Sequence, residues 1–378
     1  MYITYKTQNL QKTQQLDLYE AILKGIPFEM PTDKQSYPSY ITVSTEKLVH
    51  TPFNEQQAST LKVLLYGLAE KIKPLISEID SHYYSFKIPK HNGKFRQIDA
   101  PDNTLKLVLT QVKDALQYNC QIHPHNAAFA YVPKRSNKHA VEKHQQNQSK
   151  WFLHIDLKDF FSSCDEAFIH NQLKQIYPFN TMYQNKDDIT VMQIIVQSAL
   201  YKGRLPQGTP LSPFLTNIIM IPIDYALHNL CKQWNKQHFV YTRYADDIDI
   251  SSKYEFDYKA LLAEINKIVG TQTPLKINYE KVRYSSVNYK NWHLGLMLNQ
   301  QNQITVGTKK KKLIKTKLHN FCTNKENWST EDAQTFLGEL AYFRNIEQDY
   351  HDFLIAEYTH KYNSNLDIIQ ELQNMLKL

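Results

Sequence analysis

Glycine is scarce in this sequence. Only 9 of its 378 residues are glycine, about a third of the usual frequency of roughly 7%. None of them stand in the spacing of a GxGxxG turn or a GxxxxGK[ST] loop, the backbone arrangements with which Rossmann domains and P-loop enzymes bind phosphates. The scarcity argues against dinucleotide-dependent enzymes and P-loop NTPases.

Cysteine and long apolar runs are also rare. The four cysteines, at positions 120, 164, 231 and 322, are too scattered for a CxxC zinc motif or a secreted disulfide framework. The first residues lack the apolar core of a signal peptide, and the most apolar stretch, 215–227, is interrupted by polar residues and too short to span a bilayer. We therefore expect a reduced, cytoplasmic protein without a membrane partner.

Aromatic residues, by contrast, are abundant. With 25 Tyr, 17 Phe and 4 Trp in a chain that is 42% hydrophobic, a sizeable core can form, which excludes intrinsic disorder. The length exceeds what one core usually fills and favours two or three structural regions around a shared core. Lys and Arg number 44 against 37 Asp and Glu, a net charge of +7. This is a modest bias toward polyanionic partners.

Several stretches have the pattern of β-strands, including two short ones at 274–284 and 291–306. Residues 151–157, WFLHIDL, form a nearly continuous apolar run, which is typical of a buried central strand. Residues 239–252, FVYTRYADDIDISS, predict a hairpin with two acids at its tip. Residues 86–101 contain two β-like runs on either side of His-Asn-Gly-Lys at 91–94, the residue types of a tight turn, and predict a basic hairpin.

The rest of the chain is mostly helical by its periodicity. We expect a helix to start near Ser212, capped by its hydroxyl, after the Gly- and Pro-rich loop 203–213, and another to be capped by Ser329. The other segments with helical spacing are 59–79, 103–118, 136–146, 189–201, 212–235, 257–269 and most of 309–378.

Acidic residues stand at the ends of two predicted strands. Asp156 lies near the end of the central strand, and Asp246 and Asp247 lie at the hairpin tip. If both elements belong to one sheet, three carboxylates converge, and like charges in a buried cluster are costly unless cations neutralise them. Two Mg²⁺ ions would do so and would support phosphoryl transfer. The plain alternative is that each acid is a surface turn residue.

Three motifs around these acids occur in one order along the chain. They are Asp156 followed by Leu-Lys-Asp-Phe-Phe, the loop Leu-Pro-Gln-Gly-Thr-Pro-Leu-Ser-Pro at 205–213, and Tyr-Ala-Asp-Asp at 244–247. From about Phe86 to Tyr342 the sequence resembles the prokaryotic reverse transcriptases, a group that includes retron, group II intron and phage-defence enzymes. The resemblance implies an α+β right-hand polymerase with an antiparallel palm sheet backed by helices.

The same resemblance implies a division of the chain into four regions. Residues 1–85 are an N-terminal helical region whose role is not legible. Residues 86–150 correspond to the fingers, residues 151–300 to the palm with the catalytic motifs, and residues 301–378 to the helical thumb.

Site residues follow from the resemblance one by one. Asp156, Asp246 and Asp247 match the family's metal-binding acids, with the carbonyl of Leu157 as a further ligand of two Mg²⁺ ions, for which Mn²⁺ can substitute. Phe161 matches the bulky residue that blocks a ribose 2′-hydroxyl and so selects deoxynucleotides. Ordinary core packing is the alternative for Phe161.

Four other positions match residues that contact the nucleotide. Gln207 and Gly208 match the loop that lies against the incoming nucleotide and the template base, where a residue without Cβ permits close approach. Arg96 matches the fingers arginine that clamps the triphosphate. Lys281 matches the lysine proposed to protonate the leaving pyrophosphate, and a solvated strand residue is its alternative.

A basic run opens the predicted thumb. Six lysines fall between positions 309 and 317, and they fit sequence-independent phosphate contacts along a duplex, although a solvated charged face is the alternative. Residues 293–298 resemble the hairpin that holds the primer end. Retron enzymes commonly carry Val-Thr-Gly there, whereas this chain has His293-Leu294-Gly295. The lysines predicted to bind nucleic acid are Lys309, Lys310, Lys311, Lys312 and Lys315.

The function that the resemblance implies is RNA-directed DNA polymerisation. The enzyme would add dNTPs to a 3′-hydroxyl by two-metal-ion phosphoryl transfer, with an RNA template and a nucleic-acid primer as partners, and a structured noncoding RNA or an accessory protein as further candidates. A role in bacterial antiphage defence is a hypothesis. The alternatives are template-independent or protein-primed DNA synthesis by the same site, an RNA-dependent RNA polymerase, which Phe161 disfavours, and a noncatalytic RNA-binding scaffold.

Overall fold

The computed structural model describes residues 52–89, 93, 95–234, 238–270, 273–289, 291, 293–362 and 367–376, with residues 52–55 described as backbone alone. Of the predicted N-terminal region 1–85, the part before residue 52 therefore lies outside the described residues. Most of the predicted turn at 91–94 lies outside them too.

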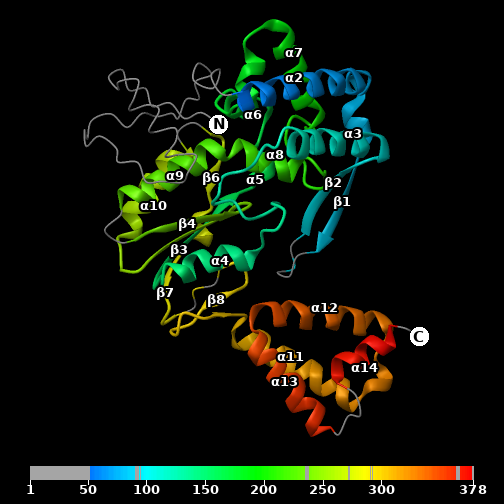
Figure 1. The fold of residues 1–378 in the computed structure, drawn as a ribbon, viewed down its shortest axis with the longest axis vertical. Coiled ribbons are helices and arrows are strands. Elements are labelled where there is room, and N and C mark those ends of the chain that lie inside the picture. The colour runs from blue at the N-terminus through cyan, green and yellow to red at the C-terminus, as the bar shows by residue number, and fades with distance from the viewer. Residues whose placement is uncertain are drawn as a thin grey trace.

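A sheet of antiparallel pairs forms the middle of the molecule (Figure 1). Strand β3 (Trp151–Lys158) pairs on one side with β5 (Asp247–Ser252), and β4 (Val240–Tyr244) extends the sheet beyond β5. On its other side β3 pairs with the short strands β6 (Lys276–Ile277) and β7 (Arg283–Ser286). The apolar run at 151–157 is thus a central strand and residues 239–252 form a hairpin, as predicted.

The two faces of this sheet differ in chemistry. Leu153, Ile155 and Ile248 are fully buried in the main hydrophobic core, on the face packed by α9 (Ile221–Gln233) and α10 (Tyr258–Gly270). Side chains alternate along a strand, so Phe152, His154 and Asp156 lie on the opposite face. Helix α4 (Asn137–Gln146) covers part of that face.

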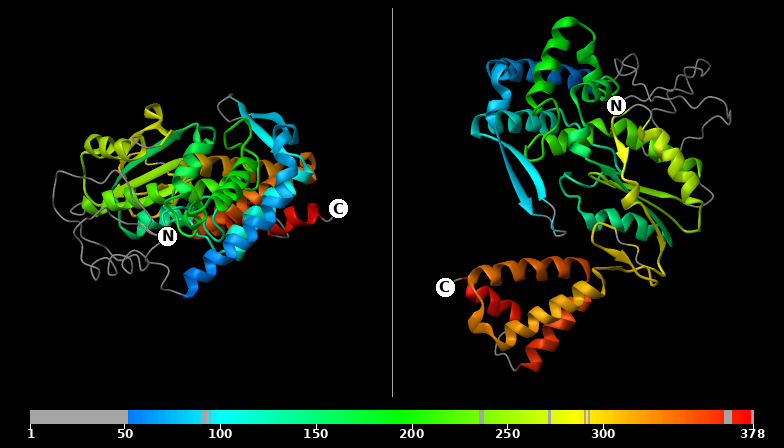
Figure 2. Two further views of the ribbon diagram at one scale, coloured as in Figure 1. Left: turned by 90° about the horizontal axis from the view of Figure 1, so that it is seen from above. Right: turned by 180° about the vertical axis from the view of Figure 1, so that it is seen from behind.

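An extended hairpin projects beside the sheet. Strands β1 (Tyr83–Pro89) and β2 (Phe95–Pro101) pair antiparallel, with Ile88 opposite Arg96, and this confirms the predicted hairpin. The β1–β2 ribbon extends from a group of helices at one end of the molecule (Figure 1 and Figure 2). Those helices are α2 (Pro52–Ile72), the 3₁₀ helix Lys73–His82, α3 (Asn103–Asp114), α5 (Phe160–Ser163), α6 (Glu166–Leu173), α7 (Lys186–Ser198) and α8 (Ser212–Ile219), with a 3₁₀ turn at Phe179–Tyr183 and a π turn at Ala115–Asn119.

Two sequence predictions in this part were wrong. The helix predicted over 212–235 is two helices, because α8 ends at Ile219 and α9 begins anew with Pro222 in its first turn, where proline is tolerated. The hydroxyl of Ser212 does not cap α8. Thr209 Oγ1 instead accepts a hydrogen bond from the Ser212 backbone N–H at 3.0 Å.

The C-terminal part is a helical bundle with its own core. It follows the β8 (Met297–Leu298) and β9 (Ile304–Thr305) hairpin and comprises α11 (Gly307–Thr323), the 3₁₀ turn Lys325–Asn327, α12 (Thr330–Ile346), α13 (Gln348–Lys361) and α14 (Ile368–Met375). Ser329 caps α12 in a capping box with Asp332, which confirms that prediction. The bundle's core also contains Val141 of α4 and Phe152 of β3. Figure 2 shows the bundle below the sheet.

The remaining sequence expectations concern sulfur chemistry and membranes. All four cysteines are free thiols, three of them buried. Within the described ranges, no helix combines the length and the apolar character needed to cross a bilayer. The α+β class is confirmed by the antiparallel sheet and the helices that cover it.

Candidate active site

The three predicted acids come together at one end of the sheet. Asp156 of β3 lies opposite Asp247 in the β3–β5 ladder, and the Leu157 backbone N–H donates to the Asp246 carbonyl at 3.0 Å. The tip between β4 and β5 is tight because Ala245 adopts a left-handed conformation, with φ of 59°. Residues about ninety positions apart in the sequence thus share one edge of the sheet.

The charges at this edge are poorly compensated. Burial is the main cause that raises the pKa of Asp246, and the Asp156 charge adds to it, while Lys281 and Arg96 act in the opposite direction. Burial also raises the pKa of Asp247 to about 7, helped by the neighbouring carboxylates and opposed by His154. A site that resists ionisation of its own acids is one in which a bound cation is favoured.

Asp156 has positive and polar partners of its own. Lys281 Nζ donates to Asp156 Oδ2 at 2.7 Å, and Asn278 Nδ2 donates to Oδ1 at 3.1 Å. Lys281 belongs to the 3₁₀ turn Tyr279–Lys281 rather than to a strand, and its side chain is 56% exposed. The lysine therefore lies against one of the acids instead of standing free in solvent.

The donor set suits divalent metal ions. Carboxylate and carbonyl oxygens are the ligands that Mg²⁺ prefers, and burial, helped by neighbouring carboxylates, raises the pKa values of Asp246 and Asp247. As they stand, the described residues contain no group of three or more His, Cys, Asp or Glu side chains gathered as metal ligands. Each oxygen of Asp156 accepts one hydrogen bond, from Asn278 or Lys281, and keeps a lone pair that can bind a metal ion.

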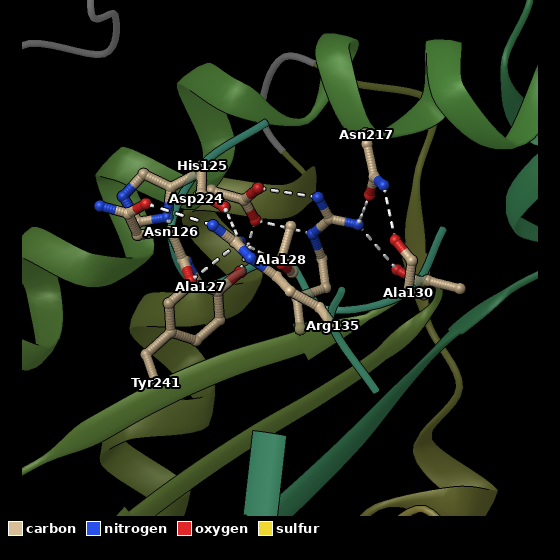
Figure 3. A network of polar contacts seen from close by, with 11 residues as sticks. His125, Asn126, Ala127, Ala128, Ala130, Arg135, Asn217, Asp224 and Tyr241 are labelled. Atoms are coloured by element: carbon tan, nitrogen blue, oxygen red, sulfur yellow. Dashed lines mark hydrogen bonds and ion pairs between the residues drawn. The ribbon is translucent and has the colours of Figure 1, made fainter. Parts of the chain in front are cut away.

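A buried ion pair supports the β4–β5 turn that carries Asp246 and Asp247. Arg243 donates from Nε and Nη2 to both carboxylate oxygens of Asp224, at 2.7 and 2.8 Å, and neither side chain is exposed. Arg243 Nη1 also donates to Asn217 Oδ1 and to the carbonyl of Ala245, each at 3.1 Å. Tyr241 adds a hydrogen bond to Asp224 at 2.6 Å (Figure 3). The guanidinium thus joins helices α8 and α9 to the turn that carries the acids.

The same network fixes the segment 125–130. The backbone N–H of Arg243 donates to the Ala127 carbonyl at 2.7 Å, and the Phe129 N–H donates to the Arg243 carbonyl at 2.8 Å. Asn217 and Arg135 donate to the carbonyls of Ala130 and Ala128, as Figure 3 shows. This segment is therefore held rigidly beside β4, and it leads directly into Tyr131.

An aromatic pair stands near the acids. Phe161 is only 9% exposed, and its ring meets the ring of Tyr131 edge to face at 6.4 Å between centroids. Tyr131 is 50% exposed, and the charge of Asp246 helps burial to raise the pKa of its hydroxyl. The predicted sugar-selecting phenylalanine is thus backed by core packing on one side and covered by a second, more accessible ring.

The loop with Gln207 and Gly208 contacts the β1–β2 ribbon. The Gln207 carbonyl accepts a hydrogen bond from the Asp99 N–H at 2.7 Å. Gly208 has φ of 130°, and a Cβ there would stand 2.7 Å from Ile98 Cγ2. Arg96 lies two residues before Ile98, hence on the same face of the ribbon. The structure therefore brings the loop and the ribbon together, and the charge of Arg96 acts on Asp246.

The lysine run on α11 divides into free and engaged side chains. Lys309 and Lys312 are exposed. Lys310 lies over the ring of Tyr342 at 4.5 Å, and Lys315 lies at 5.9 Å from the ring of Tyr350. Lys311 also stacks on Tyr350 and pairs with Glu347 at 2.5 Å. The ammonium of Lys311 therefore already has an acidic partner.

Comparison with known proteins assigns the chain to a family. The profile described as reverse transcriptase (RNA-dependent DNA polymerase) matches residues 88–337. The chain belongs to the reverse transcriptase family. Its fold is that of a right-hand polymerase, and its activity is RNA-directed DNA polymerisation. Reverse transcriptases copy RNA templates and use divalent metal ions.

Individual proteins similar to this chain include two retron enzymes. The Retron Ec73 reverse transcriptase of Escherichia coli is 28% identical over 296 residues, which are 77% of this chain and 90% of that protein. The Retron Ec83 reverse transcriptase of Escherichia coli is 27% identical over 292 residues, 74% of this chain and 87% of that protein. Among solved structures, apo telomerase from Candida tropicalis matches 79% of this chain and 64% of its own, at 11% identity and a TM-score of 0.43.

Three residues of this candidate site escaped the sequence reasoning. Arg243 carried a signal, because a charged residue in a buried strand must find a partner. Asn278 and Tyr131 carried none, since each becomes relevant only through a side chain that is distant in the sequence, Asp156 in one case and Phe161 in the other.

Proposed function

We propose that this reverse transcriptase copies an RNA template into DNA at the edge of the sheet formed by Asp156, Asp246 and Asp247. The observation that carries the proposal is the pairing of Asp156 with Asp247 in neighbouring strands, with Asp246 joined to Leu157 by a backbone hydrogen bond. Because three acids share one edge, the site can hold two cations beside a primer terminus.

The metal ions proposed for this edge are two Mg²⁺, with Mn²⁺ as a substitute. Asp156, Asp246, Asp247 and the carbonyl of Leu157 would hold them, and the ions would stabilise the attacking and leaving oxygens of phosphoryl transfer. Lys281 lies on Asp156 at 2.7 Å, so it neutralises that acid in this state. Its proposed role as proton donor to pyrophosphate requires the ammonium to turn away from Asp156.

The incoming dNTP is proposed to lie between the β1–β2 ribbon and the acids. Arg96 would bind the triphosphate, because a guanidinium suits bidentate contact with phosphate oxygens. Gln207 and Gly208 would lie against the nucleotide, and Phe161 would exclude a 2′-hydroxyl by overlap.

The lysines of α11 are proposed to contact duplex phosphates, and Lys309 and Lys312 are the best placed of them. Both side chains are exposed, and within the described part of the chain neither ammonium forms an ion pair with an acid, unlike Lys311 and Lys317. A free ammonium on the surface can neutralise a phosphate without first giving up a partner.

Primer extension tests the proposal directly. Purified protein is given dNTPs and Mg²⁺ with a primed RNA template, a primed DNA template, or primer alone. We expect extension on RNA, and loss of extension in the variant Asp246→Asn plus Asp247→Asn. A control variant, Asp187→Asn plus Asp349→Asn, removes two exposed acids elsewhere and should extend like the wild type. Full extension by the first variant would refute the site assignment.

The same assay separates the alternative reactions. Extension of primer alone indicates template-independent synthesis, and product covalently attached to the protein indicates protein priming. Preference for rNTPs indicates an RNA polymerase. Salt-dependent RNA binding without any incorporation indicates a scaffold. Each outcome contradicts the proposed reaction in a different and observable way.

The relatives suggest the biological setting. Because the Ec73 and Ec83 relatives are named retron reverse transcriptases, we propose that a structured noncoding RNA serves as the partner in cells. Sequencing the nucleic acid that copurifies with the expressed protein tests this. A role in antiphage defence stays a prediction, which plaque counts on cells carrying wild-type or Asp246→Asn plus Asp247→Asn protein would check.

A further inference from the structure

A buried polar layer lies directly beneath the catalytic acids. His154 of β3 and Asp249 of β5 are cross-strand partners, each two residues from an acid of the site and on the same face of the sheet. His154 Nδ1 donates to Asp249 Oδ1 at 2.9 Å, and His154 Nε2 lies 3.4 Å from Asp247 Oδ1. This layer therefore contacts Asp247 and includes none of the three acids of the site.

A third member of this layer comes from outside the sheet. His293 Nδ1 donates to the same Asp249 oxygen at 2.8 Å, and the two side chains are almost fully buried, at 2% and 3% exposure. The His293 ring packs against Phe152 at 4.6 Å and stacks on His144 of α4 at 5.7 Å. One carboxylate thus joins two histidines from two distant segments.

The charge of Asp249 is well stabilised in this arrangement. Its side chain is only 3% exposed, and its Oδ1 accepts hydrogen bonds from His154 at 2.9 Å and from His293 at 2.8 Å. A buried carboxylate with two charge-assisted hydrogen bonds is directional, since each bond loses strength when its donor shifts or tilts. Hydrophobic packing alone would tolerate such shifts.

His293 belongs to the segment that leads into the thumb. Its backbone forms a bridge with Leu296, and β8 and β9 follow and enter α11. Leu296 and Leu298 are buried in the core of the helical bundle. The Asp249–His293 bond is therefore a direct polar link between the strand that carries Asp247 and the segment that resembles the primer-holding hairpin. A valine, common at this position in retron enzymes, could not form it.

We propose that Asp249 and His293 are positioning residues that fix the 293–298 hairpin relative to the catalytic strand. The pair then sets where the primer 3′ end lies with respect to Asp246 and Asp247. The proposal rests on the proposed function, because it assumes that the hairpin contacts the primer. It adds a polar tie, built from residues that neither touch the nucleotide nor hold metal.

Two substitutions of similar size test the tie. His293→Asn places an amide donor close to the position of Nδ1, whereas His293→Leu has a similar shape and no donor. Both lose the imidazole ring, so they share its packing loss. Asp249→Asn, which removes the charge of the acceptor, is measured beside them. Melting temperature and circular dichroism establish that each variant is folded, and steady-state primer extension gives KM for the primer–template and kcat.

A second histidine provides the matched control. His351 of α13 is also buried and donates from Nδ1 to Asp352 at 2.8 Å, but it lies in the helical bundle away from the sheet. His351→Leu removes the hydrogen-bond donor, whereas His351→Asn keeps a comparable one. We expect equal KM values for this control pair.

The expected result is a split between the two His293 variants. His293→Leu should raise KM for the primer–template about tenfold over His293→Asn, since a hairpin that is no longer fixed must be ordered when the primer binds. Asp249→Asn keeps an acceptor oxygen without the charge, so its KM should lie between the two. Equal KM values for folded His293→Leu and His293→Asn would overturn the tie. If His293→Leu does not fold, Asp249→Leu, which removes the acceptor, takes its place, and wild-type KM in that variant has the same meaning. Absence of extension by the wild type would instead count against the proposed function.

Discussion

Gly208 allows the sharpest test of how the β1–β2 ribbon and the loop with Gln207 and Gly208 fit together. The substitution Gly208→Ala adds one methyl group, and that Cβ would stand 2.7 Å from Ile98 Cγ2 and 3.0 Å from the Asp99 carbonyl oxygen. Carbon atoms in contact are ordinarily about 3.5–4.0 Å apart. Ile98 is β-branched and stiff, and the Asp99 N–H is bonded to Gln207. The ribbon and the loop must therefore separate.

The displacement needed is about 1 Å, the difference between the ordinary carbon contact and the 2.7 Å found here. The φ of 130° at Gly208 adds backbone strain of about 1–3 kcal/mol for any residue with a Cβ. Arg96 moves with Ile98 because both lie on one face of β2. A misplacement of about 1 Å can cost about 100-fold in rate, which corresponds to about 2.7 kcal/mol of activation free energy.

The assay is steady-state incorporation of one dNTP on a primed RNA template, with kcat/KM for the nucleotide as the readout. Gly203→Ala is the matched control, because Gly203 also has a positive φ, of 74°, but a Cβ added there would meet no atom within 4 Å. We expect kcat/KM to fall about 100-fold for Gly208→Ala and much less for Gly203→Ala.

A rescue variant completes the test. Ile98→Ala removes the Cγ2 atom of the closest contact, so Ile98→Ala plus Gly208→Ala should recover part of the lost kcat/KM. The Asp99 carbonyl and the backbone strain stay, which is why recovery should be partial. If Gly208→Ala and Gly203→Ala lower kcat/KM equally, the close approach of loop and ribbon does not determine nucleotide binding, and the reasoning fails.

Three further predictions concern the surroundings of the site. Arg243→Met leaves the buried Asp224 carboxylate without its cation, so the free energy of unfolding in urea should fall by about 3–5 kcal/mol. Adding Asp224→Leu should recover much of this loss, and a double variant less stable than either single variant would contradict the role of the ion pair. Phe161→Ala should raise rNTP incorporation relative to dNTP by about tenfold or more, and an unchanged ratio would leave Phe161 as a core residue. Burial lowers the pKa of His144 from 6.5 to about 3, so protonation of this residue in the unfolded chain should reduce the free energy of unfolding as the pH falls below about 6.5, by about 2 kcal/mol at pH 5. His144→Gln should make the free energy of unfolding less dependent on pH, and a pH dependence identical to that of the wild type would show that His144 is not buried in its neutral form.

Much of the secondary structure could be predicted from local signals. The strand at 151–157 is apolar because both of its faces are covered, and the cap at Ser329 depends on a residue three positions away. The cap at Ser212 was predicted wrongly because two hydroxyl residues lie three positions apart, and Thr209 is the one whose oxygen accepts the hydrogen bond. Local patterns specify that a helix starts but do not decide between neighbouring caps.

The candidate site was predictable in its residues more than in its contacts. The order of motifs identified the acids, and the sheet pairs Asp156 with Asp247. That Lys281 lies on Asp156, and that Lys311 pairs with Glu347, depends on tertiary packing between segments up to 125 residues apart. A charged side chain has many potential partners in a sequence, and only the folded chain selects one.

The core shared by α4, β3 and the C-terminal helices limits how this enzyme can be recombined with its relatives. Val141 and Phe152 contribute side chains to the same apolar interior as Phe321, Phe336 and Phe343. A chimera that exchanges the C-terminal helices for those of another polymerase would inherit a mismatch at positions 141 and 152, in the form of a void or an overlap. A chimera with intact packing must therefore exchange positions 141 and 152 together with the C-terminal helices.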